Sequence, residues 1–156
     1  MKTLDSKTAL IAASFLAATF YQGGAFAYYS ASGVLDPAGN NPSATTFATV
    51  RCFDDGHGAP DHLLAAVQDT SGQADKLHLS FQLFKDRQTI TVTDENSGDG
   101  DGGWSRIIGL RGGEGIYRMA LHKTNVGSRN FTVGWQCQTE GYVDTGTEII
   151  SVPQLQ

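Results

Sequence analysis

Hydrophobic and polar residues alternate along most of the chain from residue 45 onward. In the clearest example, Leu77, Leu79, Phe81 and Leu83 are separated by single polar residues. Successive side chains of a strand point to opposite faces, so this period of two predicts strands with one buried face. The predicted strands are 45–53, 63–68, 77–83, 90–93, 105–110, 117–121, 131–137 and 148–152.

Turn-forming segments separate these runs, among them 70–75, 111–114 and 125–129. About eight short strands with this spacing are typical of an antiparallel β-sandwich, and we expect a jelly-roll-like arrangement. The run at 63–67 is rich in Leu and Ala and could form a helical turn instead. The expected fold class is therefore all-β.

The first 27 residues differ from the rest and predict a signal peptide. Lys2 and Lys7 precede an apolar stretch at 8–20, which is too short to span a bilayer comfortably. Residues 25–27 then form an A-x-A cleavage motif. The alternative is a buried N-terminal helix of the mature fold.

Cleavage at this motif would start the mature chain near Tyr28 and place it in the periplasm or outside the cell. Residues 28–44 are rich in Ser, Gly, Asn and Pro, and we expect a flexible lead-in there, with the sandwich over 45–156. No later segment is apolar for long enough to cross a membrane, so we expect no membrane span in the mature protein.

Export changes the meaning of the two cysteines, Cys52 and Cys137. In an oxidising compartment they are expected to form a disulfide, with two separate thiols as the alternative. Cys52 shares a strand face with Val50, and Cys137 shares one with Trp135, so both sulfur atoms should point into the core. The bridge would then join two strands through the interior.

Charge and motifs exclude several function classes. The chain has 156 residues, with 11 Lys and Arg against 16 Asp and Glu, a formal net charge of −5. Without a basic block, nucleic acid is a poor partner. There is no G-x-S-x-G or C-x-x-C motif. We expect a small exported, non-enzymatic protein with a binding or structural role, whose partner is a protein or a glycan.

An acidic, glycine-rich segment at 94–103 is the first candidate site. Ca²⁺ prefers several hard oxygen ligands on a flexible backbone, so this segment predicts a calcium site that stabilises the fold, although it does not match the EF-hand pattern. A solvated turn is the alternative. The next residue, Trp104, could stack on a sugar. The candidate ligands are Asp94, Asn96, Asp99 and Asp101.

A second polar cluster lies within nine residues and contains Asp54, Asp55, His57, Asp61 and His62. Histidine with carboxylates could bind zinc or another transition metal, or form an acid–base pair. The protein would then be a periplasmic metal-dependent enzyme or a metal-handling protein. The spacing H-x-x-x-x-H on a loop with Gly and Pro matches no zinc template, so a turn between strands is the alternative.

The segment 75–137 resembles bacterial pre-peptidase C-terminal domains, which are small jelly-roll-like sandwiches of secreted proteins. The resemblance lies in the alternating strands 77–83 and 90–93, an acidic loop, Gly115, Tyr117, Met119, Leu121, Gly127 and 131–133. In that family the module usually accompanies a peptidase and is similar to carbohydrate- or protein-binding modules. The resemblance therefore implies a binding or accessory role.

Overall fold

The computed structural model describes residues 29–94, 103–152 and 154–155, so the proposed signal peptide lies outside the described residues. The described residues are all-β, and none of their segments is a helix that could cross a membrane. Their strands are β1 (Tyr29–Leu35), β2 (Thr45–Phe53), β3 (His62–Asp69), β4 (Leu79–Lys85), β5 (Gln88–Asp94), β6 (Ile108–Arg111), β7 (Gly115–Lys123), β8 (Arg129–Gln138), β9 (Gly146–Ser151) and β10 (Gln154–Leu155).

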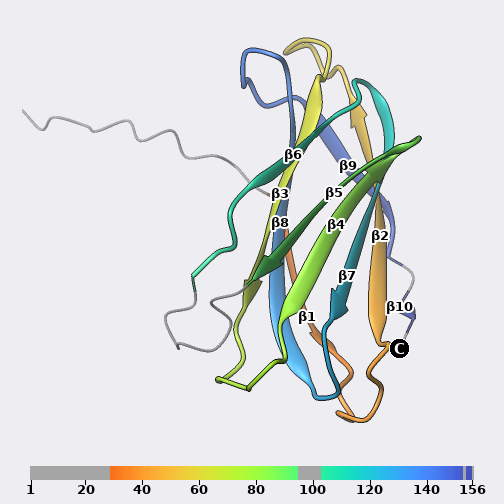
Figure 1. The fold of residues 1–156 in the computed structure, drawn as a ribbon. Helices are drawn as coiled ribbons and strands as arrows, with labels where there is room; N and C mark the ends of the chain where they lie inside the picture. Colours follow the sequence, from red (N-terminus) through yellow and green to blue (C-terminus); the bar gives the residue numbers. More distant parts are fainter. Residues whose placement is uncertain (1–28, 95–102, 153, 156) are drawn as a thin grey trace, which may run out of the picture.

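Two antiparallel sheets pack face to face, which confirms the predicted sandwich (Figure 1). One sheet has the order β1-β8-β3-β6, and the other has the order β10-β2-β7-β4-β5, with β9 also paired to β2. The pairs β1–β8, β2–β7, β3–β6 and β4–β5 are those of one long antiparallel ribbon rolled over itself. This pairing makes the fold a jelly roll.

The expected flexible lead-in at 28–44 is largely structured. Residues 29–35 form β1, the edge strand beside β8, and the Ser32 and Thr132 hydroxyls lie 2.8 Å apart across this pair. The jelly roll needs this strand as the partner of β8, so the sandwich extends N-terminally beyond residue 45. The hydrophobic pattern does not reveal it, because an edge strand with small residues buries few apolar side chains.

The run at 63–67 belongs to β3 and does not form a helical turn. β3 lies between β8 and β6, and most of its side chains on both faces are buried. A strand covered on both faces is continuously apolar, so its sequence does not alternate.

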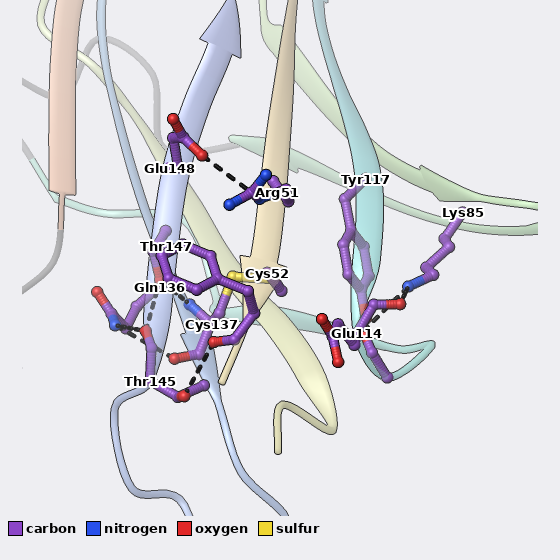
Figure 2. Close-up of a disulfide and its surroundings, with 12 residues drawn as sticks. Arg51, Cys52, Lys85, Glu114, Tyr117, Gln136, Cys137, Thr145, Thr147 and Glu148 are labelled. Atoms are coloured by element: carbon purple, nitrogen blue, oxygen red, sulfur yellow. Dashed lines mark hydrogen bonds and ion pairs between the residues drawn. A yellow bond between two sulfur atoms is a disulfide. The ribbon is translucent and has the colours of Figure 1, made fainter. Parts of the chain in front are cut away.

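The predicted disulfide is present between Cys52 and Cys137, whose Cα atoms are 5.6 Å apart (Figure 2). Both side chains are fully buried, and β2 and β8 belong to different sheets. The bridge therefore joins the two layers through the core, as the strand parity predicted. A disulfide of this kind is typical of proteins from oxidising compartments.

A buried ion pair holds the turn after β1 against the end of β7. Lys123 Nζ donates to Asp36 Oδ2 over 2.6 Å, and the two side chains are 0% and 3% exposed. The Asp36 carboxylate also accepts the backbone N–H groups of Asn40 and Asn41. Burial by itself would raise the pKa of Asp36, but the Lys123 and backbone hydrogen bonds outweigh it and lower the pKa below the usual value.

This lowered pKa gives a pH prediction. The unfolded chain binds a proton at Asp36 at a higher pH than the folded protein does, so this carboxylate stabilises the fold above pH about 4. That contribution is lost as the pH falls through the lowered pKa. We expect Asp36→Asn to be less stable at pH 7 and to lose less further stability between pH 5 and pH 2.5, measured by urea unfolding. Asp86→Asn, at an exposed position, is the control; an equal effect in both variants would contradict the assignment.

Candidate functional site

One end of the sandwich carries an open groove between the β2–β3 loop and the segment that joins β8 to β9. The start of β1 and the last residue of β2 complete its walls. The groove is lined by Tyr29, Phe53, Asp55, His57, Gln136 and residues 143–147. Asp55 and His57 of the polar cluster predicted at 54–62 therefore line the groove, together with residues far away in the sequence.

The loop after β2 is shaped by Asp54. Its Oδ1 accepts the backbone N–H groups of Gly56 and Gly58, at 2.8 and 3.1 Å. Gly56 and Gly58 have φ angles of +103° and +115°, which side chains with a Cβ rarely adopt. Asp54 is therefore a turn-forming residue and does not line the groove.

Asp55 and His57 form a pair on this loop. Asp55 Oδ1 and His57 Nδ1 are 2.9 Å apart, and the His57 side chain is 67% exposed. The hydrogen bond with His57 lowers the pKa of Asp55 against the opposing effect of burial, so Asp55 is ionised at neutral pH. The pair presents an oriented imidazole and an anionic acceptor to the groove.

The hydroxyl group of Thr145, on the opposite wall of the groove, holds the loop after β2 in place. Thr145 Oγ1 lies 2.8 Å from the carbonyl oxygen of Gly58, 3.2 Å from that of Phe53 and 3.3 Å from Asp55 Oδ1. These contacts of the Thr145 hydroxyl tie the two walls of the groove together. The Thr145 hydroxyl therefore bonds within the walls of the groove.

Gln136 lines the groove, and its side-chain amide is held by the backbone around it. Its side chain is 3% exposed, and Nε2 donates to the carbonyl oxygens of Cys137 and Thr145 (Figure 2). These two bonds fix the orientation of the amide. Oε1 is buried and has no hydrogen-bond partner among the described residues. Leaving a buried acceptor without a donor costs about 1–3 kcal/mol.

Two aromatic rings flank these polar groups. Tyr29 is 52% exposed, and its ring stacks on Trp135 with the centroids 6.4 Å apart. The guanidinium of Arg51 lies 4.8 Å from the centre of the Phe53 ring. The groove thus combines an exposed apolar ring face with carboxylate, amide and imidazole groups.

Asp61 and His62, the last two members of the predicted cluster at 54–62, do not line the groove. Asp61 Oδ2 lies 2.8 Å from His62 Nδ1 and 2.8 Å from Arg111 Nη1. His62 is buried at the start of β3, and its ring makes a T-shaped contact with the Tyr142 ring, with the centroids 5.3 Å apart. The structure therefore divides the cluster into two pairs. Within the described ranges, no three or more His, Cys, Asp or Glu side chains are grouped to hold a metal ion.

The predicted calcium segment lies mostly outside the described residues, because Asn96, Asp99 and Asp101 fall in the gap at 95–102. Asp94 is buried, and its Oδ2 accepts the backbone N–H of Asp69. The calcium site thus stays a prediction. Trp104 is 48% exposed and lines a shallow hollow beside the end of β5, where it is accessible for the stacking role predicted for it.

Another buried polar group supports a turn and is not part of a site. Lys85 Nζ donates to the carbonyl oxygens of Gly113 and Glu114 and lies 4.2 Å from the centre of the Tyr117 ring (Figure 2). Tyr117 donates to the Gly113 carbonyl oxygen, and burial raises the pKa of Tyr117 to about 12. All these contacts fix the turn between β6 and β7.

Sequence reasoning missed Tyr29, Gln136 and residues 143–147. Gln136 occupies a polar position in an alternating strand, which predicts an ordinary surface residue. Only the segment after β8 buries it, by folding back over the end of that strand. No local signal marks such an event; the Thr-rich stretch 145–147 before β9 is the closest hint.

Comparison with known proteins adds no family. No protein-family model, no curated protein and no solved structure matches the chain. The resemblance to pre-peptidase C-terminal domains stays a prediction.

Proposed function

We propose that this protein is a small exported, non-enzymatic β-sandwich that binds a glycan in the groove between the β2–β3 loop and the β8–β9 segment. The observation that carries the proposal is an open groove in which the Asp55–His57 pair lies beside the half-exposed ring of Tyr29. The ionised carboxylate of Asp55 can accept hydrogen bonds from ligand hydroxyl groups.

The surrounding charges favour a ligand rich in hydrogen-bond donors. Asp55 is ionised, and Asp144 also lines the groove and accepts from Gln138 Nε2 over 2.8 Å. Carboxylates accept several hydrogen bonds and repel anions. A neutral sugar, with many hydroxyl donors, suits these groups better than a phosphorylated or acidic ligand.

The exposed ring of Tyr29 supports a sugar over a purely polar ligand. An aromatic ring that is half exposed offers an apolar face with a polar hydroxyl at its edge. A pyranose ring has an apolar C–H face and a polar rim, so it can stack on Tyr29 while its hydroxyl groups donate to Asp55 and Asp144. Of the two partner classes predicted from the sequence, this arrangement favours the glycan.

Export is part of the proposal. The leader at 1–27 and its cleavage site are supported by their sequence pattern, and the Cys52–Cys137 disulfide fits the periplasm or the extracellular space. The accessory role implied by the resemblance to pre-peptidase C-terminal domains agrees with a binding function. Calcium at 94–101 would order the fold, and thermal unfolding with and without CaCl₂ tests this point.

The alternative, a metal-dependent enzyme built on 54–62, has less support. Its carboxylates and histidines lie in two separate pairs in the described structure, and the Thr145 hydroxyl is directed to loop acceptors. The Asp55–His57 pair is better suited to bind hydroxyl groups than to complete a catalytic set.

An oligosaccharide array followed by titration tests the groove. We expect the oxidised protein to bind a neutral oligosaccharide, and Tyr29→Ala and Asp55→Asn each to weaken binding about tenfold, because the first loses the stacking ring and the second an anionic acceptor for ligand hydroxyl groups. Asp86→Asn is the matched control, since Asp86 is an exposed aspartate that does not line the groove.

Two outcomes would contradict the groove assignment. One is that no oligosaccharide binds. The other is that binding survives both groove substitutions but is lost in Trp104→Ala, which would place the sugar at the hollow beside β5. Thermal unfolding of each variant ensures that lost binding is not lost folding.

A further inference from the structure

Strand β1 forms an edge of the smaller sheet. It pairs with β8 over residues 29–35 without a register shift, and with no other strand of the described residues. Leu35 is the one buried residue of the seven. In an edge strand, alternate backbone N–H and C=O groups point away from the neighbouring strand, where a further strand can pair with them. The exposed backbone of β1 therefore fits one kind of partner, which is another extended chain.

The composition of β1 leaves this edge unprotected. Natural sheets block their edges with charged residues, proline, bulges or very short strands. The sequence of β1, YSASGVL, contains no charged residue and no proline, and its pairing with β8 is regular along its whole length. None of the usual obstacles to strand addition is present in β1.

The other edges of the described sandwich do carry such obstacles. At the side opposite β1, the edge strands β5 and β6 contact each other, and β6 has four residues. The edge beside β2 is shared by β9 and the two-residue β10, and the register of β9 shifts between Thr49 and Val50. β9 also carries the exposed Glu148. This contrast makes β1 the edge best suited to a partner strand.

Charge and symmetry favour a second copy of this chain as the partner. The chain has a formal net charge of −5, so two copies repel one another over much of their surface, but β1 itself is uncharged. Antiparallel pairing of two β1 strands can place Ser32 opposite Ser32 of the second copy. Ala31 then lies opposite Gly33 of the second copy, and Ser30 opposite Val34 of the second copy. Small residues thus meet at the centre, and every contact occurs twice, as a two-fold interface requires.

We propose that β1 pairs antiparallel with β1 of a second copy, with Ser32 at the two-fold axis, so that the two smaller sheets join into one continuous sheet. The new backbone hydrogen bonds satisfy the groups that the edge leaves to solvent. This interface does not depend on glycan binding in the groove.

Sedimentation equilibrium of the exported, oxidised protein tests the proposal. A single pair of strands makes a small interface, so we expect a reversible dimer that forms between about 10 and 500 µM. Ser32→Lys and Ser32→Asp should each raise the dissociation constant about tenfold or more, because two like charges then lie opposite each other across the axis. An equimolar mixture of these two variants should restore the dimer, because the introduced charges are then opposite in sign.

The matched control is Thr91→Lys. Thr91 is an exposed residue in the middle of β5, which is also an edge strand of seven residues, so its substitution should leave the dimer unchanged. Thermal unfolding of each variant verifies that it is folded. Should a Ser32 variant fail to fold, Ala31→Lys places a charge at the neighbouring exposed position of β1 and repeats the test.

Four results would overturn the proposal. The first is a protein that stays monomeric up to about 500 µM, the concentration at which even a weak interface of this size should form. The second is a dimer that tolerates a charge at Ser32 or Ala31. The third is a dimer that Thr91→Lys dissociates, and the fourth is a failure of the mixed Ser32 variants to associate.

Discussion

Removal of the disulfide by the double substitution Cys52→Ala/Cys137→Ala is expected to cost about 4–5 kcal/mol of unfolding free energy. The bridge closes a sequence separation of 85 residues, and in the chain-entropy model a loop of this length restricts the unfolded chain by that amount. Domains are stable by only about 5–15 kcal/mol in total. The variant should therefore be only marginally folded at 37 °C.

Guanidinium unfolding of the oxidised protein and the variant measures this loss. The control is reductant: it should lower the stability of the wild type to about that of the double variant and leave the double variant unchanged. A loss below about 1 kcal/mol would contradict this expectation and would show that residual structure already restricts the unfolded chain.

Arg129→Met is expected to cost about 3–5 kcal/mol, the second largest effect. Arg129 is 1% exposed, and its guanidinium donates to the carbonyl oxygens of Gly72 and Leu77. Its Nε lies 3.5 Å from Oδ2 of Asp69, a side chain with 0% exposure. Removal of the cation leaves a buried carboxylate unpaired, which is why breaking one partner of a buried pair is so costly.

A double variant separates charge from packing. Arg129→Met/Asp69→Asn also removes the stranded carboxylate, so it should recover part of the lost stability. Arg118→Met, at an exposed position on β7, is the matched control and should cost less than about 1 kcal/mol. An Arg129→Met variant as stable as this control, measured by urea unfolding, would contradict the role assigned to the pair.

The fold class could be predicted because strand alternation is a local signal. The β4 residues Leu79, Phe81 and Leu83 alternate in the sequence and all face the core. The disulfide could be predicted for the same reason, since the parity of Cys52 and Cys137 is set by their own strands. β1 was missed because its register with β8 depends on a partner about 100 residues away.

The candidate site was only partly predictable. The sequence placed Asp55 and His57 in a polar cluster, and they do lie together at a groove. It could not separate them from Asp61 and His62, whose partners are Arg111 and Tyr142 on other segments. Gln136 gave no signal at all, because the burial of its oxygen is decided by a segment that packs over it.

The sequence by itself determined which faces of the strands are apolar and that the two sulfur atoms point inward, because side-chain direction in a strand follows from the backbone alone. Tertiary structure alone decided which strands pair, how the Asp54–His62 cluster divides, and that Gln136 is buried under the segment after β8. These features depend on contacts between segments distant in the chain, and such contacts are set by the packing of the whole sandwich.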